Sequence, residues 1–187
     1  GGVLGPFNIS AKLALRKYFL RADGIICISK YLQSHYMDKN IKTIVVPPTL
    51  DTHSFLKEIP FQQIPENEIT IIYAGTPGKK DKIRVVYNAV NKFNLLSKDK
   101  KVVLNIFGLS EQAAKDNFGI IENHYVSILG VIDQALVSEQ VSKHMFTIIV
   151  RDVEVFSKAG FPTKFVESLA CGTPVIANLT SDLVDYL

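Results

Sequence analysis

Short runs of apolar residues alternate with longer stretches in which apolar and polar residues follow a helical spacing. Each run has the length of a buried strand, and each longer stretch has the length of a helix. Strands are predicted at 24–28, 43–46, 69–74, 102–107, 126–129, 146–150 and near Val175. Helices are predicted at 10–22, 30–37, 81–96, around 111–117, at 134–143 and from Thr163 onward. This alternation predicts an α/β fold with a doubly wound parallel sheet.

Residues 47–68 interrupt the pattern. Four prolines (Pro47, Pro48, Pro60, Pro65) break any regular element there, among Gln, Glu and Asn residues. We take this segment as a boundary between two sheets. Residues 1–46 hold only two predicted strands, and 182–187 begins a helix that stops with the chain. Both ends predict an excerpt from a longer protein.

Composition narrows the function classes. The chain has 187 residues, 47% hydrophobic and 21% charged, which suits one domain, or one domain plus a fragment. A net charge of +3 fits an anionic small substrate or an anionic membrane surface but is too weak to indicate nucleic acid. No apolar run approaches the roughly 18 residues of a membrane span. The basic residues of the 10–22 helix could contact anionic lipid, with a solvated helix face as the alternative.

The cysteines and histidines predict neither a disulfide nor a metal site. Cys27 and Cys171 lie far apart inside apolar segments and read as small buried side chains in a reducing compartment. The histidines show no ligand spacing. No nucleophile motif of the G-x-S-x-G kind and no close carboxylate pair stands out. Hydrolytic chemistry with a covalent nucleophile is therefore not indicated.

The stretch from Ala159 to Ala177 reads as loop, helix, turn and strand. Thr163 is expected to cap the helix, whose residues Phe165, Val166, Leu169 and Ala170 are expected to face a core, and Gly172 to close it. Backbone N–H groups at such a helix N-terminus suit an anion, and Glu167, one turn further in, could accept hydrogen bonds from sugar hydroxyls. An ordinary corner with a solvated glutamate is the alternative.

A second glycine-containing loop, Gly75-Thr-Pro-Gly-Lys-Lys-Asp81, lies between a predicted strand and a predicted helix. Its glycines would let the backbone approach a phosphate, and Lys79 and Lys80 would supply charge. The spacing matches neither a Walker A loop nor G-x-G-x-x-G. A solvated turn in which Asp81 caps the next helix is the alternative. In a parallel sheet this loop, residues 107–108 and residues 151–164 would meet at the carboxyl ends of the strands.

Taken together, these residues resemble the GT-B glycosyltransferases of the large retaining group that is common in bacterial cell-surface polysaccharide synthesis. Three stretches carry the resemblance, and they cover nearly the whole chain in the family's order: 22–29, 44–55 and 161–177. The resemblance implies that 1–46 is the end of an acceptor-side domain, 47–68 an interdomain linker and 69–187 most of a donor-binding domain. It also implies a cytoplasmic enzyme, with a peripheral contact to the inner face of the membrane as an alternative.

The resemblance also assigns residues. Glu167 matches the second glutamate of the family's Glu-x7-Glu motif, which holds the donor ribose, whereas Ala159 stands at the first. Of the family's diphosphate-binding Arg and Lys, Thr76 takes the Arg position and Lys80 (or Lys79) the Lys position. The other expected donor contacts are Gly75, Gly78, Gly130, Val131, Arg151, Phe161, Pro162, Thr163 and Lys164.

The implied reaction transfers a sugar from a nucleotide-diphosphate sugar to a hydroxyl of a carbohydrate or lipid-linked acceptor. No cofactor and no obligatory metal are expected. Lys80 and Lys79 would stabilise the charge of the leaving group. Two other functions remain open: a non-catalytic nucleotide-sugar binding module, which Ala159 favours, and a GT-B nucleotide-sugar epimerase. The resemblance implies that this chain by itself binds the donor without turning it over.

Overall fold

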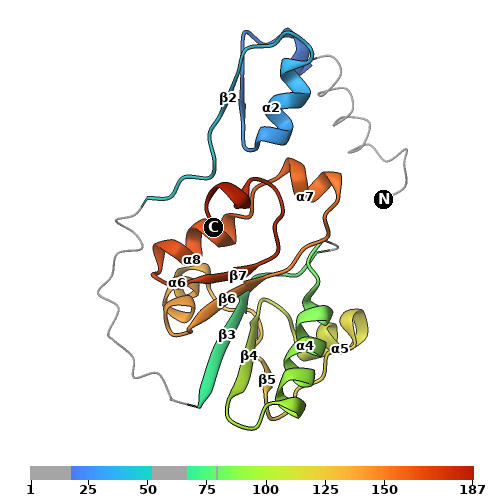
Figure 1. Cartoon of the computed structure of the whole chain (residues 1–187), viewed down its shortest axis with the longest axis vertical. Coiled ribbons are helices and arrows are strands. Elements are labelled where there is room, and N and C mark those ends of the chain that lie inside the picture. Colours follow the sequence, from blue (N-terminus) through green and yellow to red (C-terminus); the bar gives the residue numbers. More distant parts are fainter. Residues whose placement is uncertain (1–17, 52–66, 79) are drawn as a thin grey trace.

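A five-stranded parallel sheet forms the larger part of the structure, a computed structural model that describes residues 18–51, 67–78 and 80–187 (Figure 1). In spatial order its strands are β5 (Val126–Ile128), β4 (Lys101–Phe107), β3 (Glu68–Ala74), β6 (Phe146–Ile149) and β7 (Val175–Ala177). The strand order reverses between β3 and β6. In doubly wound sheets that reversal marks the place where ligands bind, outside the carboxyl ends of the strands.

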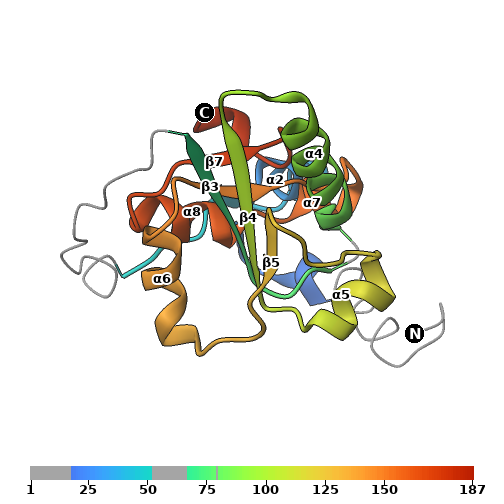
Figure 2. The same ribbon diagram turned by 90° about the horizontal axis from the view of Figure 1, so that it is seen from below.

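Helices cover both faces of this sheet, as the two views in Figures 1 and 2 show. Helices α4 (Ile83–Leu96) and α5 (Glu111–Phe118) lie on one face, and α6 (Gln134–Ser142) and α8 (Thr163–Ala170) on the other. Successive side chains of a strand point to opposite faces. Ile71 of β3 accordingly packs in the cluster that contains α4, and Ile72 packs with Val141 of α6. The predicted doubly wound α/β fold is confirmed.

A smaller unit precedes this sheet. It consists of the 3₁₀ helix η2 (Phe19–Arg21), strand β1 (Ile25–Cys27), helix α2 (Lys30–Met37) and strand β2 (Thr43–Val45), with the two strands parallel. Cys27 and Tyr36 are buried, whereas the register partners Ile26 and Ile44 are both exposed. In the described part of the chain, one face of this two-stranded sheet is therefore uncovered.

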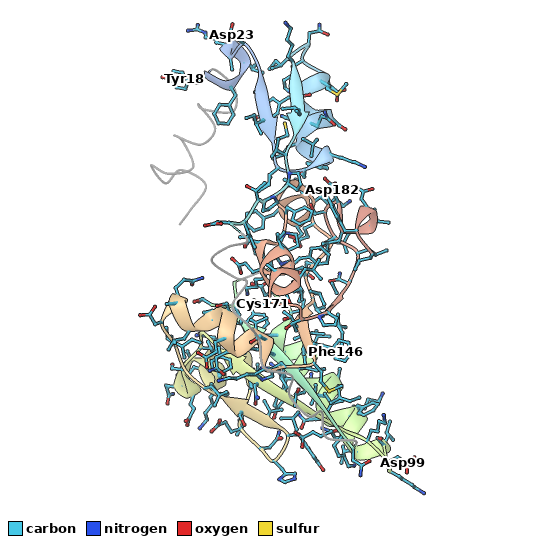
Figure 3. The ribbon with its side chains drawn as sticks, turned by 90° about the vertical axis from the view of Figure 1, so that its left-hand side faces the viewer. Tyr18, Asp23, Asp99, Phe146, Cys171 and Asp182 are labelled. Carbon is cyan, nitrogen blue, oxygen red and sulfur yellow. The ribbon has the colours of Figure 1, made fainter. Side chains whose placement is uncertain are left out.

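Polar contacts join the smaller unit to the larger one. The Ser29 hydroxyl donates to the carbonyl of Ala159, the last residue of α7 (Val155–Ala159), at 2.8 Å. The Lys30 amide donates to Asp182 Oδ2 at 2.7 Å, and Lys30 Nζ lies 2.9 Å from Asp185 Oδ2. Figure 3 shows Asp182 at this boundary. The N-terminal end of α2 is thus held against the segments that follow β6 and β7.

Most element bounds agree with the sequence pattern. Helix 30–37 is exact, and its predicted cap is present, because Ser29 Oγ accepts the Leu32 amide at 3.3 Å. Gly172 closes α8 with φ 71°, as predicted. The predicted final helix is a single 3₁₀ turn, η3 (Leu183–Asp185). Most of the predicted helix 10–22 and most of the 47–68 segment lie outside the described residues.

Three expectations about local structure are wrong. Helix α4 begins at Ile83 and not at residue 81, and the Asp81 carboxylate contacts the Gly78 amide and Arg151 instead of capping the helix. The N-cap of α8 is Pro162, whose carbonyl accepts the Phe165 amide, so Thr163 is the first helical residue. Helix α7 lies where a loop was expected.

The buried face of α8 also differs from the expectation. Leu169 is 50% exposed, and Ser168 is buried in its place. Ser168 Oγ lies 2.7 Å from Thr147 Oγ1 on β6 and 2.8 Å from the Thr173 carbonyl. This hydroxyl ties α8 to the sheet, which is a structural role, because its polar neighbours satisfy it internally.

Candidate functional site

The candidate site lies at the carboxyl ends of β3 and β6, where the strand order reverses. Gly75 follows β3 with φ 122°, and its amide donates to the Phe107 carbonyl at the end of β4 at 3.1 Å. A Cβ on Gly108 would lie 2.5 Å from the Gly75 carbonyl carbon. A Cβ on Gly75 would lie 2.7 Å from Lys164 Cε. Glycine at both positions therefore lets the loop pass between the end of β4 and the side chain of Lys164.

A buried ion pair fixes this loop to the chain that follows β6. Arg151 Nε lies 3.3 Å from Asp81 Oδ1, and both side chains are buried. The other carboxylate oxygen of Asp81 accepts the Gly78 amide at 2.9 Å. A backbone hydrogen bond also connects the two segments: the Lys82 amide donates to the Val150 carbonyl at 2.8 Å. Asp81 is therefore a loop anchor and not the helix cap that the alternative interpretation expected.

Lys164, in the first turn of α8, reaches across Gly75 to β3. Its Nζ lies 3.1 Å from the Tyr73 hydroxyl and 4.1 Å from the centre of the Tyr73 ring. Burial lowers the pKa of Lys164 to about 8, against the opposing effect of the nearby Asp81 carboxylate. Burial also raises the pKa of the Tyr73 hydroxyl far above its usual range, and Asp81, to which that hydroxyl is hydrogen-bonded, adds to the increase.

Lys80 adds a further cation within the glycine loop. Its Nζ lies 5.1 Å from the centre of the Phe156 ring on α7, a cation–π contact. Lys79, the other lysine expected in catalysis, lies outside the described residues. Helix α7 thus presents the Phe156 ring to Lys80.

The α8 end of the site combines buried and accessible residues. Phe161 packs edge-on against Phe165 and Tyr186, and Pro162 is fully buried, so the side chains of both expected donor contacts belong to the core. Thr163 is exposed, and Glu167 is half-buried. The first amide groups of a helix have no partner within it, which leaves those of Thr163 and Lys164 available to an anion, whereas the Phe165 amide donates to the Pro162 carbonyl.

A groove of about 590 Å³ adjoins the loop. Its walls come from three segments that follow β3, β4 and β5: Thr76, Pro77, Gly78, Gly108, Leu109, Ser110, Ala113, Asn117, Phe118 and Val131. Gly130 has φ 71°, and its carbonyl accepts the Gly108 amide at 2.7 Å, which holds the turn before Val131 against the end of β4. This groove has space for a planar or ring-shaped group beside the glycine loop.

The structure therefore brings most of the expected residues to one edge of the sheet. Thr76, Gly78 and Val131 line the groove, and Gly75, Lys164 and Arg151 lie beside it. Sequence reasoning missed the parts played by Tyr73, Asp81 and Phe156. Only Asp81 carried a signal, because a carboxylate inside a glycine- and lysine-containing loop needs a partner when it is buried.

No group of three His, Cys, Asp or Glu residues in the described ranges is placed to hold a metal ion. No helix among the described residues is long and apolar enough to span a membrane.

Comparison with solved structures assigns the fold. Trehalose-6-phosphate synthase OtsA superposes with a TM-score of 0.64 at 10% identity, covering 96% of this chain and 51% of that one. The lipopolysaccharide outer core galactosyltransferase WaaB gives 0.59 at 18% identity, covering 88% and 46%. TarM gives 0.58 at 10% identity, covering 86% and 31%. The chain has the GT-B glycosyltransferase fold, and it spans about half or less of the length of these structures.

No protein-family model matches the sequence, and no curated protein matches it. The assignment of the fold therefore rests on the similarity to solved structures.

Proposed function

We propose that this chain carries the donor-binding part of a glycosyltransferase that moves a sugar from a nucleotide-diphosphate sugar to a hydroxyl acceptor with retention of configuration. The observation that carries the proposal is the set of cations around the Gly75 loop, where the strand order reverses and next to a groove. Transfer in cell-surface polysaccharide or glycoconjugate synthesis is the biological setting we propose, since the resemblance in sequence is to enzymes of that kind.

The charges of the site suit a diphosphate. Lys80, Arg151 and Lys164 come from three different segments, and both Lys80 and Arg151 lie close enough to Lys164 to lower its pKa. Two carboxylates, Asp81 and Glu167, oppose them, and Asp81 is already paired with Arg151. An anionic ligand would therefore gain from the surplus of positive charge, most of all in a partly buried site.

Each part of the site receives a role in this proposal. The groove holds the nucleoside, and Gly130 and Val131 contact its nucleobase. The Gly75–Lys80 loop and the α8 N-terminus hold the diphosphate, and Glu167 accepts hydrogen bonds from the ribose. Lys80, together with Lys79, stabilises the negative charge that develops on the leaving group.

The proposed division of the chain follows from these roles. Residues 69–187 bind the donor, 47–68 form the linker and 1–46 belong to the acceptor-side domain. The acceptor is a carbohydrate or lipid-linked hydroxyl. We place the protein in the cytoplasm from the sequence alone. The proposed contact with an anionic membrane surface rests on the basic residues of 10–22.

A non-catalytic nucleotide-sugar binding module is the second candidate function, and Ala159 favours it. At the position where the resembling family carries its first glutamate, this chain offers a methyl group, and the Ala159 carbonyl is occupied by Ser29. A module of this kind would keep the nucleotide site and lose the contact to the donor sugar.

Sugar transfer by the full-length protein tests the proposal. We expect binding of one among uridine, guanosine and adenosine diphosphates, followed by transfer from the matching nucleotide sugar. Lys80→Ala should lower turnover by about 10²-fold or more, since it removes a charge that acts in the transition state. Glu167→Gln should weaken donor binding, as measured by calorimetry. Lys92→Met, an exposed lysine on α4, is the matched control.

Three outcomes separate the candidates. Binding without transfer or hydrolysis favours the module. Interconversion of the nucleotide sugar without an acceptor indicates an epimerase. An unchanged turnover in Lys80→Ala removes Lys80 from the mechanism.

A further inference from the structure

The Lys164 ammonium is a partly buried cation. In the described part of the chain, no Asp or Glu oxygen lies within ion-pair distance of its Nζ, whereas Arg151 has Asp81. Its contacts are the Tyr73 hydroxyl at 3.1 Å and the Tyr73 ring. Removing a charge from water without an opposite charge nearby costs free energy. A bound anion would therefore stabilise the protonated form of Lys164.

Charged groups face Lys164 from every element around it. Asp81 and Lys80 come from the loop after β3, Arg151 from the end of β6, and Glu167 from α8 itself, while Tyr73 comes from β3. The Asp81 carboxylate favours the charged form of Lys164, but it is shared with Arg151 Nε, the Gly78 amide and the Tyr73 hydroxyl. The nearby positive charges of Arg151 and Lys80 add to the cost of keeping Lys164 protonated.

The Lys164 side chain also lies directly against the backbone of the glycine loop. It crosses Gly75, the residue directly before the wall of the groove, and the missing Cβ provides the space that Lys164 Cε and Nζ occupy. A ligand that extends from the groove toward the N-terminus of α8 would pass this ammonium. The amide groups of the first turn of α8 belong to the same segment and would face the same ligand.

We propose that Lys164 is a binding residue for the phosphate groups of the ligand and that its ammonium moves from Tyr73 to a phosphate oxygen when a nucleoside diphosphate binds. The role of Lys164 depends on the proposed function only in one respect, namely that the ligand carries a diphosphate. Positive charge would then reach the diphosphate from α8 as well as from the loop, and Tyr73 would hold the lysine ready in the empty site.

Binding of a phosphate group at Lys164 should be coupled to the uptake of a proton. The pKa of Lys164 is about 8 in the empty site, and a bound phosphate raises it, because the anion favours the charged form. Binding near pH 8 to 9 therefore takes up a proton. Affinity is greatest below about pH 8 and falls as the pH rises, since the empty protein then loses the proton that binding requires.

Calorimetry on the full-length protein tests this assignment with uridine, guanosine and adenosine diphosphates and the corresponding nucleosides. Lys164→Met should weaken diphosphate binding by about tenfold or more, the loss expected for a hydrogen bond to a charged group. It should leave nucleoside binding little changed. Lys92→Met should match the unaltered protein in both.

Lys164→Arg provides the second variant, because arginine keeps its charge at every pH used. It should keep most of the diphosphate affinity and lose the decline between about pH 8 and 9.5. In the unaltered protein, titrations in buffers of different ionisation enthalpy should show proton uptake that Lys164→Arg lacks. This comparison decides the question even where Lys164→Met does not fold.

The outcomes separate the two proposals. Equal diphosphate affinity in Lys164→Met and the unaltered protein overturns the role of Lys164 and leaves the donor class intact. An identical pH profile in Lys164→Arg also overturns that role. If the unaltered protein binds none of the three diphosphates, both proposals fail.

Discussion

Gly75 shows how one missing side chain supports the site. Its φ of 122° is one that residues with a Cβ rarely adopt, and a methyl group there would lie 2.7 Å from Lys164 Cε and 2.9 Å from Nζ. We expect Gly75→Ala to displace Lys164 and to weaken nucleoside diphosphate binding by roughly tenfold, as for loss of the charge itself. The strained backbone should also lower the free energy of unfolding by about 1–2 kcal/mol.

Gly172→Ala is the matched control for this substitution. Gly172 also has a positive φ, 71°, but a Cβ there meets nothing within 4 Å. Gly172→Ala should lower the free energy of unfolding by about 1 kcal/mol through backbone strain alone, and it should leave the nucleotide affinity unchanged. Calorimetry and denaturant titration of both variants check the pair. Unchanged affinity in Gly75→Ala would show that the position of Lys164 does not matter for the ligand.

At the scale of elements, two helix caps with the same chemistry differ in what else they hold. Ser29 caps α2, and Ser110 caps α5 by accepting the Ala113 amide at 3.2 Å. The Ser29 hydroxyl also donates to the Ala159 carbonyl at the end of α7 and is fully buried. Within the described residues, the exposed Ser110 side chain makes only the cap bond.

We therefore expect Ser29→Ala to cost more stability than Ser110→Ala. Loss of a cap accounts for about 1 kcal/mol in each. Ser29→Ala additionally leaves a carbonyl without its donor, which should bring its total to about 2–3 kcal/mol. Denaturant titration of the two variants measures the difference. Equal losses would mean that the bond to Ala159 contributes nothing to stability.

At the scale of the whole molecule, Asp182 links the two units. Its carboxylate accepts the Lys30 amide at the start of α2, and Figure 3 places it where the smaller unit meets the larger one. Asp182→Ala should expose that amide and speed its hydrogen exchange by roughly tenfold, the effect of losing a hydrogen bond to a charged group. Amides within β3 and β4 should exchange as before.

Asp116→Ala supplies the comparison. Asp116 lies on α5, where its carboxylate accepts the Gln112 side-chain amide at 2.7 Å. Exchange at Lys30 should not respond to this change. A Lys30 amide that exchanges equally fast in Asp182→Ala and the unaltered protein would contradict the linking role of Asp182.

Local sequence patterns were enough to predict most of the elements and their order. Apolar runs of strand length and helical spacing placed the strands of both sheets and the helices α2, α4, α5, α6 and α8, because burial of one face imposes those periods locally. Ser29 and Gly172 were predictable for a similar reason: capping chemistry acts within a few residues. The glycine loop after β3 could also be identified as a candidate phosphate site.

The contacts between distant residues depend on the tertiary fold. Asp81 pairs with Arg151, 70 residues away, and Lys164 reaches Tyr73 over 91 residues. No local pattern encodes such contacts, because they depend on β3 and β6 lying next to each other. The same applies to α7, which is too short to be stable alone and packs against α2. The candidate residues were visible in the sequence, and the strand order brought them together at one edge of the sheet.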